Sequence, residues 1–128
     1  MADRRLAVLL VEDDESLCRI VAGHLRRKGY AVTEAASAEA ARRTLDGGLR
    51  PAVVLLDLNL PGDTGWDLLR GPSIAAAGSP PIVITTATTV NPKQLAEFNV
   101  AGYLPKPFPI ETLLATLERL TNPERDRS

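Results

Sequence analysis

Five short apolar runs, each separated from the next by a helical pattern, organise most of this sequence. They occupy residues 6–11, 30–35, 52–57, 81–86 and 102–105. The third run is apolar at every position before Asp57, which indicates a strand covered on both of its faces. Strands and helices that alternate in this way predict a parallel sheet with right-handed crossovers and helices on both faces. The expected fold class is therefore α/β, with five parallel strands.

The segments between these runs carry helix signals of several kinds. Ser37 and Asn91 are expected to cap the second and fourth helices, and Gly29 is expected to follow the end of the first. The third helix must end near Gly71, where Gly and Pro interrupt the pattern. One apolar stripe marks the last helix, made by Ile110, Leu113, Leu114, Leu117 and Leu120.

Length and composition favour one domain inside a cell. The chain has 128 residues, so we expect a single domain at residues 1–122 and a frayed tail at 123–128. A net charge of −1 gives no bulk attraction to nucleic acid or to an anionic membrane. Cys18 is the single cysteine, which excludes an internal disulfide, and no signal-peptide or membrane-spanning pattern is evident. We therefore expect a cytoplasmic protein.

Polar residues follow the expected strands at their carboxyl ends, where ligands bind in open α/β sheets. Acidic residues 12–15 follow the first strand and Asp57 the third, while Thr86 ends the fourth and Lys106 follows the fifth. Crowded carboxylates repel one another unless a cation neutralises them, and oxygen ligands without His or Cys suit Mg²⁺. An ionised Asp57 beside Mg²⁺ and the Lys106 ammonium is a good acceptor for a phosphoryl group.

Each of these residues also has an ordinary interpretation when it is taken alone. Residues 12–15 favour a helix N-terminus, and Asp57 suits the turn at Pro61. Lys106 alone is a solvated side chain, and Thr86 alone is a strand residue. Only their joint placement on one rim of the sheet predicts a functional site.

The residues expected at this rim fall within four motifs: VEDDE at residues 11–15, LLDLNLPGDTGWDLL at 55–69, TTA at 85–87 and YLPKPF at 103–108. In this order and spacing they resemble the receiver domain of response regulators in two-component signalling, over residues 6–120. The resemblance, which is to chemotaxis receivers among others, implies a flavodoxin-like fold with strand order 2-1-3-4-5.

The resemblance also implies a phosphorylation site that uses a metal ion. Asp57 would be the phosphoacceptor. Asp13 would be a direct Mg²⁺ ligand together with Asp57, with Glu12 as its outer-sphere companion. The backbone carbonyl of Asn59 would complete the metal site.

Three further roles follow from the same resemblance. Thr86 would hydrogen-bond the phosphoryl group, and Lys106 would pair with one of its oxygens. Tyr103 matches the aromatic residue that changes rotamer on activation, so Thr86 and Tyr103 form the expected switch. The peptide bond between Lys106 and Pro107 is expected to be cis.

Departures from the family pattern fall in the second half of the chain. The segment between Thr86 and Lys106 is short, and Ala101 and Gly102 stand where an acidic pair is common. The helix that begins near Pro92 is therefore expected to be short or shifted, which affects the surface that a partner would contact.

The favoured function is a signalling module rather than an enzyme, one that promotes its own phosphorylation and dephosphorylation. It would receive phosphate from a histidine kinase or a phosphotransfer protein and contact a downstream protein, without binding nucleic acid directly. We expect no output domain in this chain; a stand-alone receiver and a part of a longer regulator or hybrid kinase both remain open. The alternative is a Mg²⁺-dependent phosphotransferase or phosphatase with an aspartyl-phosphate intermediate. It would need a general acid near Asp57, where Asn59 is an amide, and a substrate cap that the sequence lacks.

Overall fold

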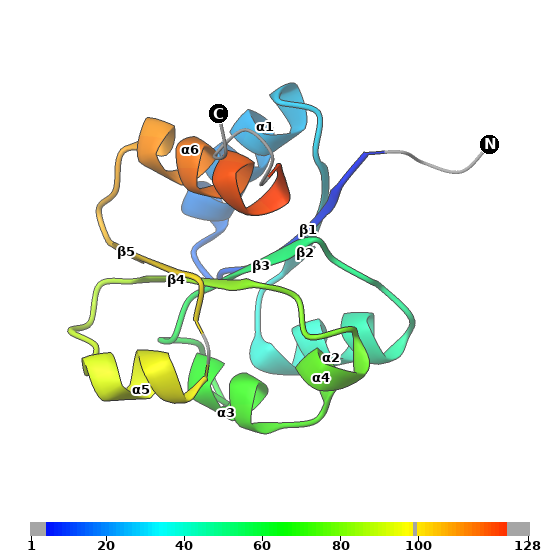
Figure 1. Cartoon of the computed structure of the whole chain (residues 1–128), viewed down its shortest axis with the longest axis vertical. Helices are drawn as coiled ribbons and strands as arrows, with labels where there is room; N and C mark the ends of the chain where they lie inside the picture. The colour runs from blue at the N-terminus through cyan, green and yellow to red at the C-terminus, as the bar shows by residue number, and fades with distance from the viewer. Residues whose placement is uncertain (1–4, 99, 123–128) are drawn as a thin grey trace.

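The computed structural model describes residues 5–98 and 100–122 and contains one parallel sheet between two layers of helices (Figure 1). The strand order is β2-β1-β3-β4-β5, as the family resemblance implied. The strands are β1 Ala7–Val11, β2 Ala31–Ala35, β3 Val53–Leu56, β4 Ile82–Thr86 and β5 Gly102–Pro105. The tail expected at residues 123–128 lies outside the described residues.

Six helices cover the sheet: α1 Glu15–Arg27, α2 Ala38–Asp46, α3 Gly65–Arg70, α4 Ser73–Ala76, α5 Pro92–Glu97 and α6 Ile110–Thr121. In Figure 1, α1 and α6 lie on one face of the sheet, and α2 to α5 lie on the other. None of the helices in the described part of the chain is long and apolar enough to cross a membrane.

The central strand β3 explains the continuous apolar run in the sequence. Val53 and Leu55 pack into the core under α1 and α6, while Val54 and Leu56 pack into the core under α2 and α3. All four side chains are fully buried because successive residues of a strand point to opposite faces. β3 therefore delivers the next residue, Asp57, to the middle of the sheet edge.

The predicted helix ends are confirmed. Ser37 accepts a hydrogen bond from the Ala40 amide at 3.1 Å, and Asn91 accepts one from the Lys93 amide at 2.9 Å. Gly29 follows α1 with a φ of +94°, a backbone conformation that favours glycine.

The region after Asp57 departs from a regular strand–helix unit, as the sequence indicated. α3 ends at Arg70, and a second short helix, α4, follows before β4. α4 is tied to α2 by the Ser73 hydroxyl, which donates to Asp46 at 2.9 Å. α5 has six residues and none of them is buried, which confirms the expected short helix.

Candidate functional site

Asp57 lies immediately after β3, and its side chain is buried although it is a carboxylate. Its backbone amide donates to the Val11 carbonyl at 3.0 Å, which fixes it beside the end of β1. Gly65 packs tightly against the same backbone, because a Cβ placed there would lie 2.6 Å from the Asp57 carbonyl oxygen. The chain after Asp57 therefore turns back closely over the site.

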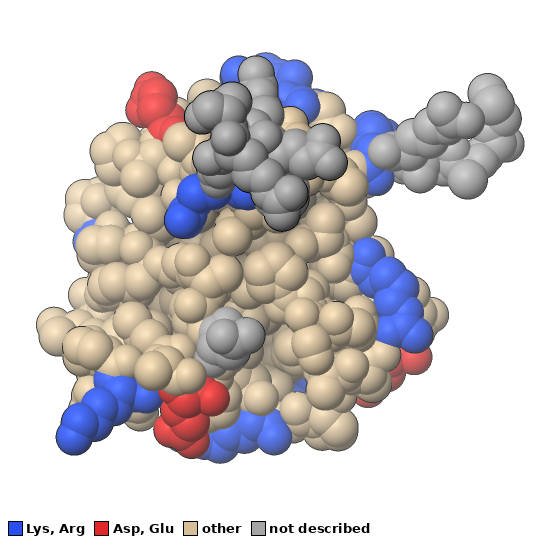
Figure 2. Space-filling model, viewed as in Figure 1, with Lys and Arg blue, Asp and Glu red and all other residues tan. Residues whose placement is uncertain are grey.

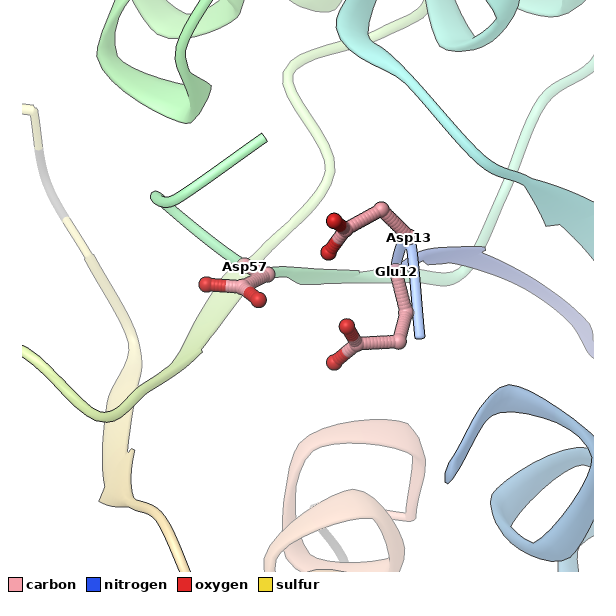
Figure 3. A group of neighbouring side chains, drawn as sticks. All are labelled: Glu12, Asp13 and Asp57. Atoms are coloured by element: carbon pink, nitrogen blue, oxygen red, sulfur yellow. The ribbon is translucent and has the colours of Figure 1, made fainter. Parts of the chain in front are cut away.

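Two more carboxylates come from the end of β1. The Glu12 backbone amide donates to Ala35 at 3.0 Å, and its buried side chain accepts a hydrogen bond from the Asp14 amide at 3.1 Å. Asp13 is exposed. Figure 3 shows the side chains of Glu12, Asp13 and Asp57 pointing into one shared space, and one oxygen of each lies within 4.8 Å of the others.

Lys106 supplies the positive charge of this cluster. Its Nζ lies 2.9 Å from Asp57 Oδ2 and also hydrogen-bonds Glu12. Its backbone amide donates to the Thr86 carbonyl at 2.9 Å, which places β5 and its following loop at the rim. The two carboxylates it contacts are only 3% and 6% exposed, a burial that would be costly without an ionic partner.

Burial and pairing shift the ionisation of this cluster. Burial raises the pKa of Glu12, although the hydrogen bond from Lys106 opposes this shift. Burial works to lower the pKa of Lys106, but its hydrogen bonds to Glu12 and Asp57 outweigh burial and raise that pKa. Lys106 therefore stays an ammonium at neutral pH, and a further cation near Glu12 would relieve the repulsion among the carboxylates.

A second network links Thr86 to the rim. The buried Thr86 hydroxyl accepts hydrogen bonds from Asn59 Nδ2 and from the Thr88 amide, each at 3.3 Å. Asn59 Nδ2 also donates to the Thr88 hydroxyl. Since both acceptor positions of the Thr86 oxygen are used, its own proton remains available for donation.

The residues expected at the site are not all in direct contact. Lys106 hydrogen-bonds both Glu12 and Asp57, whereas the Thr86 side chain joins through Asn59, whose backbone amide donates to Asp57 Oδ1 at 3.0 Å. The Tyr103 hydroxyl reaches the Thr88 carbonyl at 3.2 Å. The peptide bond before Pro107 is cis, as expected.

The sequence did not indicate the hydrogen bonds that the Asn59 side chain makes. The amide group of Asn59 joins the loop after β3 to Thr86 and Thr88 at the end of β4. These residues are 27 and 29 positions away from Asn59, so no local pattern could have revealed the link.

The donor atoms of the cluster suit a hard divalent cation. Glu12, Asp13 and Asp57 offer only carboxylate oxygens, and the soft or nitrogen ligands that favour zinc or copper are missing from this group. The acidic group therefore could hold Mg²⁺.

A parallel sheet of this order, with three carboxylates and a lysine at the carboxyl ends of its strands, defines a class of α/β signalling domain. Residues 8–118 match the response regulator receiver domain family. The chain belongs to that family, the receiver domains of two-component signalling.

Curated relatives agree with this assignment. The uncharacterized transcriptional regulatory protein YvcP of Bacillus subtilis is 33% identical over 113 residues, which are 87% of this chain and 46% of that protein. The sensory transduction protein RegX3 of Mycobacterium tuberculosis is 33% identical over 113 residues, or 87% of this chain and 48% of that protein. The chain spans about half the length of the curated relatives it matches.

Solved structures show the same fold. The chemotaxis protein CheY4 of Vibrio cholerae aligns with a TM-score of 0.81 and 31% identity, covering 91% of this chain and 98% of that one. A response regulator of Burkholderia pseudomallei aligns with a TM-score of 0.79 and 25% identity, covering 96% of this chain and 73% of that one. That structure contains a phosphorylated aspartic acid and a calcium ion.

Proposed function

We propose that Asp57 accepts a phosphoryl group from a phosphohistidine of a histidine kinase or phosphotransfer protein. One observation carries the proposal: Asp57 Oδ2 lies 2.9 Å from Lys106 Nζ, in a site where two further carboxylates converge. A carboxylate paired in this way is held in position, which is what an acceptor of a phosphoryl group requires.

The chemistry would be a simple displacement at phosphorus. An oxygen of Asp57 forms the new bond to phosphorus, the phosphorus–nitrogen bond of the donor breaks, and the imidazole leaves. Lys106 provides a positive charge for the oxygens of the transferred group, because its ammonium already lies beside Asp57. Thr86 provides a hydrogen-bond donor, since its hydroxyl oxygen already accepts from Asn59 and Thr88.

We propose that Mg²⁺ binds at the same site. Asp13, Asp57 and the backbone carbonyl of Asn59 would hold the ion directly, with Glu12 in the outer sphere. Mg²⁺ would supply charge neutralisation for the phosphoryl oxygens. The all-oxygen donor set of Glu12, Asp13 and Asp57 supports this choice of metal.

We further propose that phosphorylation changes a partner-binding surface built by α5, β5 and α6. Thr86 and Tyr103 would form the switch, since a movement of Thr86 toward the phosphoryl group disturbs Thr88, whose carbonyl holds the Tyr103 hydroxyl. A phosphoryl group shifts such an equilibrium only by its differential interaction with the two states.

The remaining assignments follow from the signalling role. We assign the receiver to residues 1–122, place it in the cytoplasm and expect a protein as the downstream target, without direct contact to nucleic acid. Figure 2 shows charged side chains of both signs lying mainly around the margin of one face, with uncharged side chains across its middle. Such a face favours a protein partner over a polyanion.

Intact-mass measurement after treatment with acetyl phosphate and Mg²⁺ tests the acceptor. The wild-type chain should gain the mass of one phosphoryl group, and Asp57→Asn should gain none while keeping its fold. Asp46→Asn is the matched control, because that carboxylate lies on α2 and contacts Ser73 rather than the site. A phosphorylated Asp57→Asn chain would contradict the assignment.

Amide chemical shifts measured with beryllofluoride, a phosphoryl mimic, test the switch. The proposal expects large shifts from residue 91 to residue 117 as well as around Asp57. Shifts confined to the surroundings of Asp13, Asp57 and Lys106 would mean that this surface does not report phosphorylation.

A further inference from the structure

The loop between Asp57 and α3, residues 58–64, is held from outside the site by α2. We propose that Glu39 of α2 is a positioning residue for the metal site, because it fixes the path of this loop and with it the Asn59 backbone. The inference rests on the proposed function, since it concerns the Mg²⁺ that the site would bind.

Glu39 contacts the backbone of the loop directly. Its Oε1 accepts a hydrogen bond from the Asp63 amide at 3.1 Å. Gly62, just before Asp63, has a φ of +74°, and a Cβ built there would lie 3.0 Å from Glu39 Oε1. Glycine at this position therefore allows both the turn and the close approach of the carboxylate.

Arg42 adds a second contact one helical turn further along α2. Its Nη1 lies 2.7 Å from Asp63 Oδ2, but the two side chains are 27% and 47% exposed. An exposed ion pair of this kind contributes little by itself. A carboxylate that accepts from a backbone amide is the stronger and more directional contact, and this bond lowers the pKa of Glu39.

The rest of the loop is anchored on both sides of Asn59. Leu58 and Leu60 are buried in the core under α2, and Pro61 restricts the backbone that follows. Thr64 and Asp67 form a reciprocal capping box that starts α3. Only Leu60 and Pro61 separate Gly62 from Asn59. A displacement of Gly62 and Asp63 is therefore transmitted to Asn59 through a short segment of restricted backbone.

Glu39 does not contact the site, so its effect would be indirect. The Asn59 amide donates to Asp57 Oδ1, which ties the same short loop to the proposed acceptor. A loop held by Glu39 before the ion arrives would lose less conformational freedom on binding it. Release of the loop should then weaken Mg²⁺ affinity without removing any ligand.

The test compares four variants with the wild-type chain by NMR titration with Mg²⁺ alone. Glu39→Ala removes the acceptor, and Glu39→Asp keeps the charge at the start of α2 but shortens the side chain. Glu39→Gln keeps a carbonyl oxygen that can accept from Asp63. Glu111→Ala is the matched control, because Glu111 occupies the corresponding second position of α6.

We expect Mg²⁺ affinity to fall in Glu39→Ala by less than about 10-fold, because Glu39 bonds to no ligand, whereas loss of a residue that bonds to a metal ligand costs about 10-fold or more. Glu39→Asp should show the same direction of change, and it keeps the test decisive if Glu39→Ala does not fold. Glu39→Gln and Glu111→Ala should bind as the wild type does. Hydrogen exchange of the loop amides, measured without metal, should accelerate only in the Ala and Asp variants.

Unchanged Mg²⁺ affinity in Glu39→Ala and Glu39→Asp, with faster exchange in the loop, would overturn the inference, because the contact would then be structural only. Equal weakening in Glu111→Ala would overturn it too, by showing a general effect of lost stability. If the wild-type chain itself bound no Mg²⁺, the metal site of the proposed function would fall, and this inference with it.

Discussion

α1 and α5 both begin shortly after a strand that ends at the functional site, yet they are anchored to the sheet very differently. α1 has thirteen residues and buries Cys18, Val21, Ala22 and Leu25. α5 has six residues and buries none. α1 follows the strand that brings Glu12 and Asp13 to the site, and α5 follows the strand that brings Thr86.

The difference separates two requirements of the site. A cluster of carboxylates that holds a metal needs fixed positions, which a well-packed neighbouring helix provides. A surface that changes on phosphorylation must come from the less stable part of a fold, and a helix as short as α5 is not stable without tertiary contacts. The acidic side of the site thus lies beside a well-anchored helix and the Thr86 side beside a weakly anchored one, an arrangement that suits the switch we propose.

Truncation of one leucine on each helix is the strongest test of this contrast. Leu25 is fully buried, so Leu25→Ala should lower the free energy of unfolding by about 2–5 kcal/mol. Leu95 on α5 is only partly buried, and Leu95→Ala should cost less than about 1 kcal/mol. Urea denaturation followed by circular dichroism measures both, and equal losses would remove the contrast.

A smaller effect on stability is expected from the ionisation of Cys18, whose thiol is buried in α1. Its pH dependence tests how tightly α1 is packed. Burial, followed by the hydrogen bond to Glu34, raises the pKa of the Cys18 thiol from 9.0 to about 12. Between these values the unfolded chain loses the thiol proton while the folded chain keeps it. The contribution of Cys18 to stability is therefore complete below pH 9 and is lost as pH rises toward 12.

Urea midpoints measured from pH 8 to pH 11 on wild type and Cys18→Ala check this expectation. The difference in urea midpoint between wild type and Cys18→Ala should become smaller as pH rises, because only the wild type carries the titrating thiol. Rapid reaction of Cys18 with a thiol reagent in the folded protein at pH 8 would contradict a buried thiol of raised pKa.

On the α5 side, the ring of Phe98 contacts two side chains of α3. Its centroid lies 5.4 Å from that of Trp66, and the Arg70 guanidinium lies 5.8 Å above it. Phe98→Leu should therefore cost about 0.5–1.5 kcal/mol and shift the emission of Trp66. Phe108→Leu is the control, since Phe108 packs against the opposite core and should leave that emission unchanged.

The sequence was sufficient for the strands, most helix ends and the residues of the acidic cluster. Each of these depends on a local signal, such as the apolar run before Asp57 or the cap at Ser37, combined with the rule that parallel strands end at one edge. The position of Lys106 beside Asp57 follows from the same rule, once the order of the strands is known.

Contacts between distant segments could not be predicted in this way. The bond from Asp63 to Glu39 joins residues 24 positions apart, and the one from Ser73 to Asp46 spans 27. Both depend on how α2 packs against the loops beyond β3, which no periodicity encodes. The short helix α4 is held by such contacts, so its four residues, Ser-Ile-Ala-Ala, gave no sign of it.

The smallest expected effect concerns the lifetime of the proposed phospho-Asp57, which Asn59 and Thr88 should tune from the Thr86 side of the site. Both residues are exposed and small, and the Asn59 amide hydrogen-bonds the Thr88 hydroxyl at the rim. A polar pair of this size leaves water a path to the phosphoryl group, so we expect relatively fast self-dephosphorylation. Replacement of both by methionine should exclude water and lengthen the lifetime a few-fold, a change in the activation free energy of about 1 kcal/mol or less.

The decay of phospho-Asp57 is measured after the phosphodonor has been removed. The double variant also loses the hydrogen bond between Asn59 and Thr86, which can lower the yield of phosphorylation. Because the decay is followed separately, this lower yield does not change the measured lifetime. Thr89→Met is the matched control, because Thr89 is an exposed neighbour of Thr88 and should leave the decay unaltered. A shorter or unchanged lifetime in the double variant would show that these two side chains do not limit the access of water. The rate would then be set elsewhere in the site, where Lys106 hydrogen-bonds Asp57.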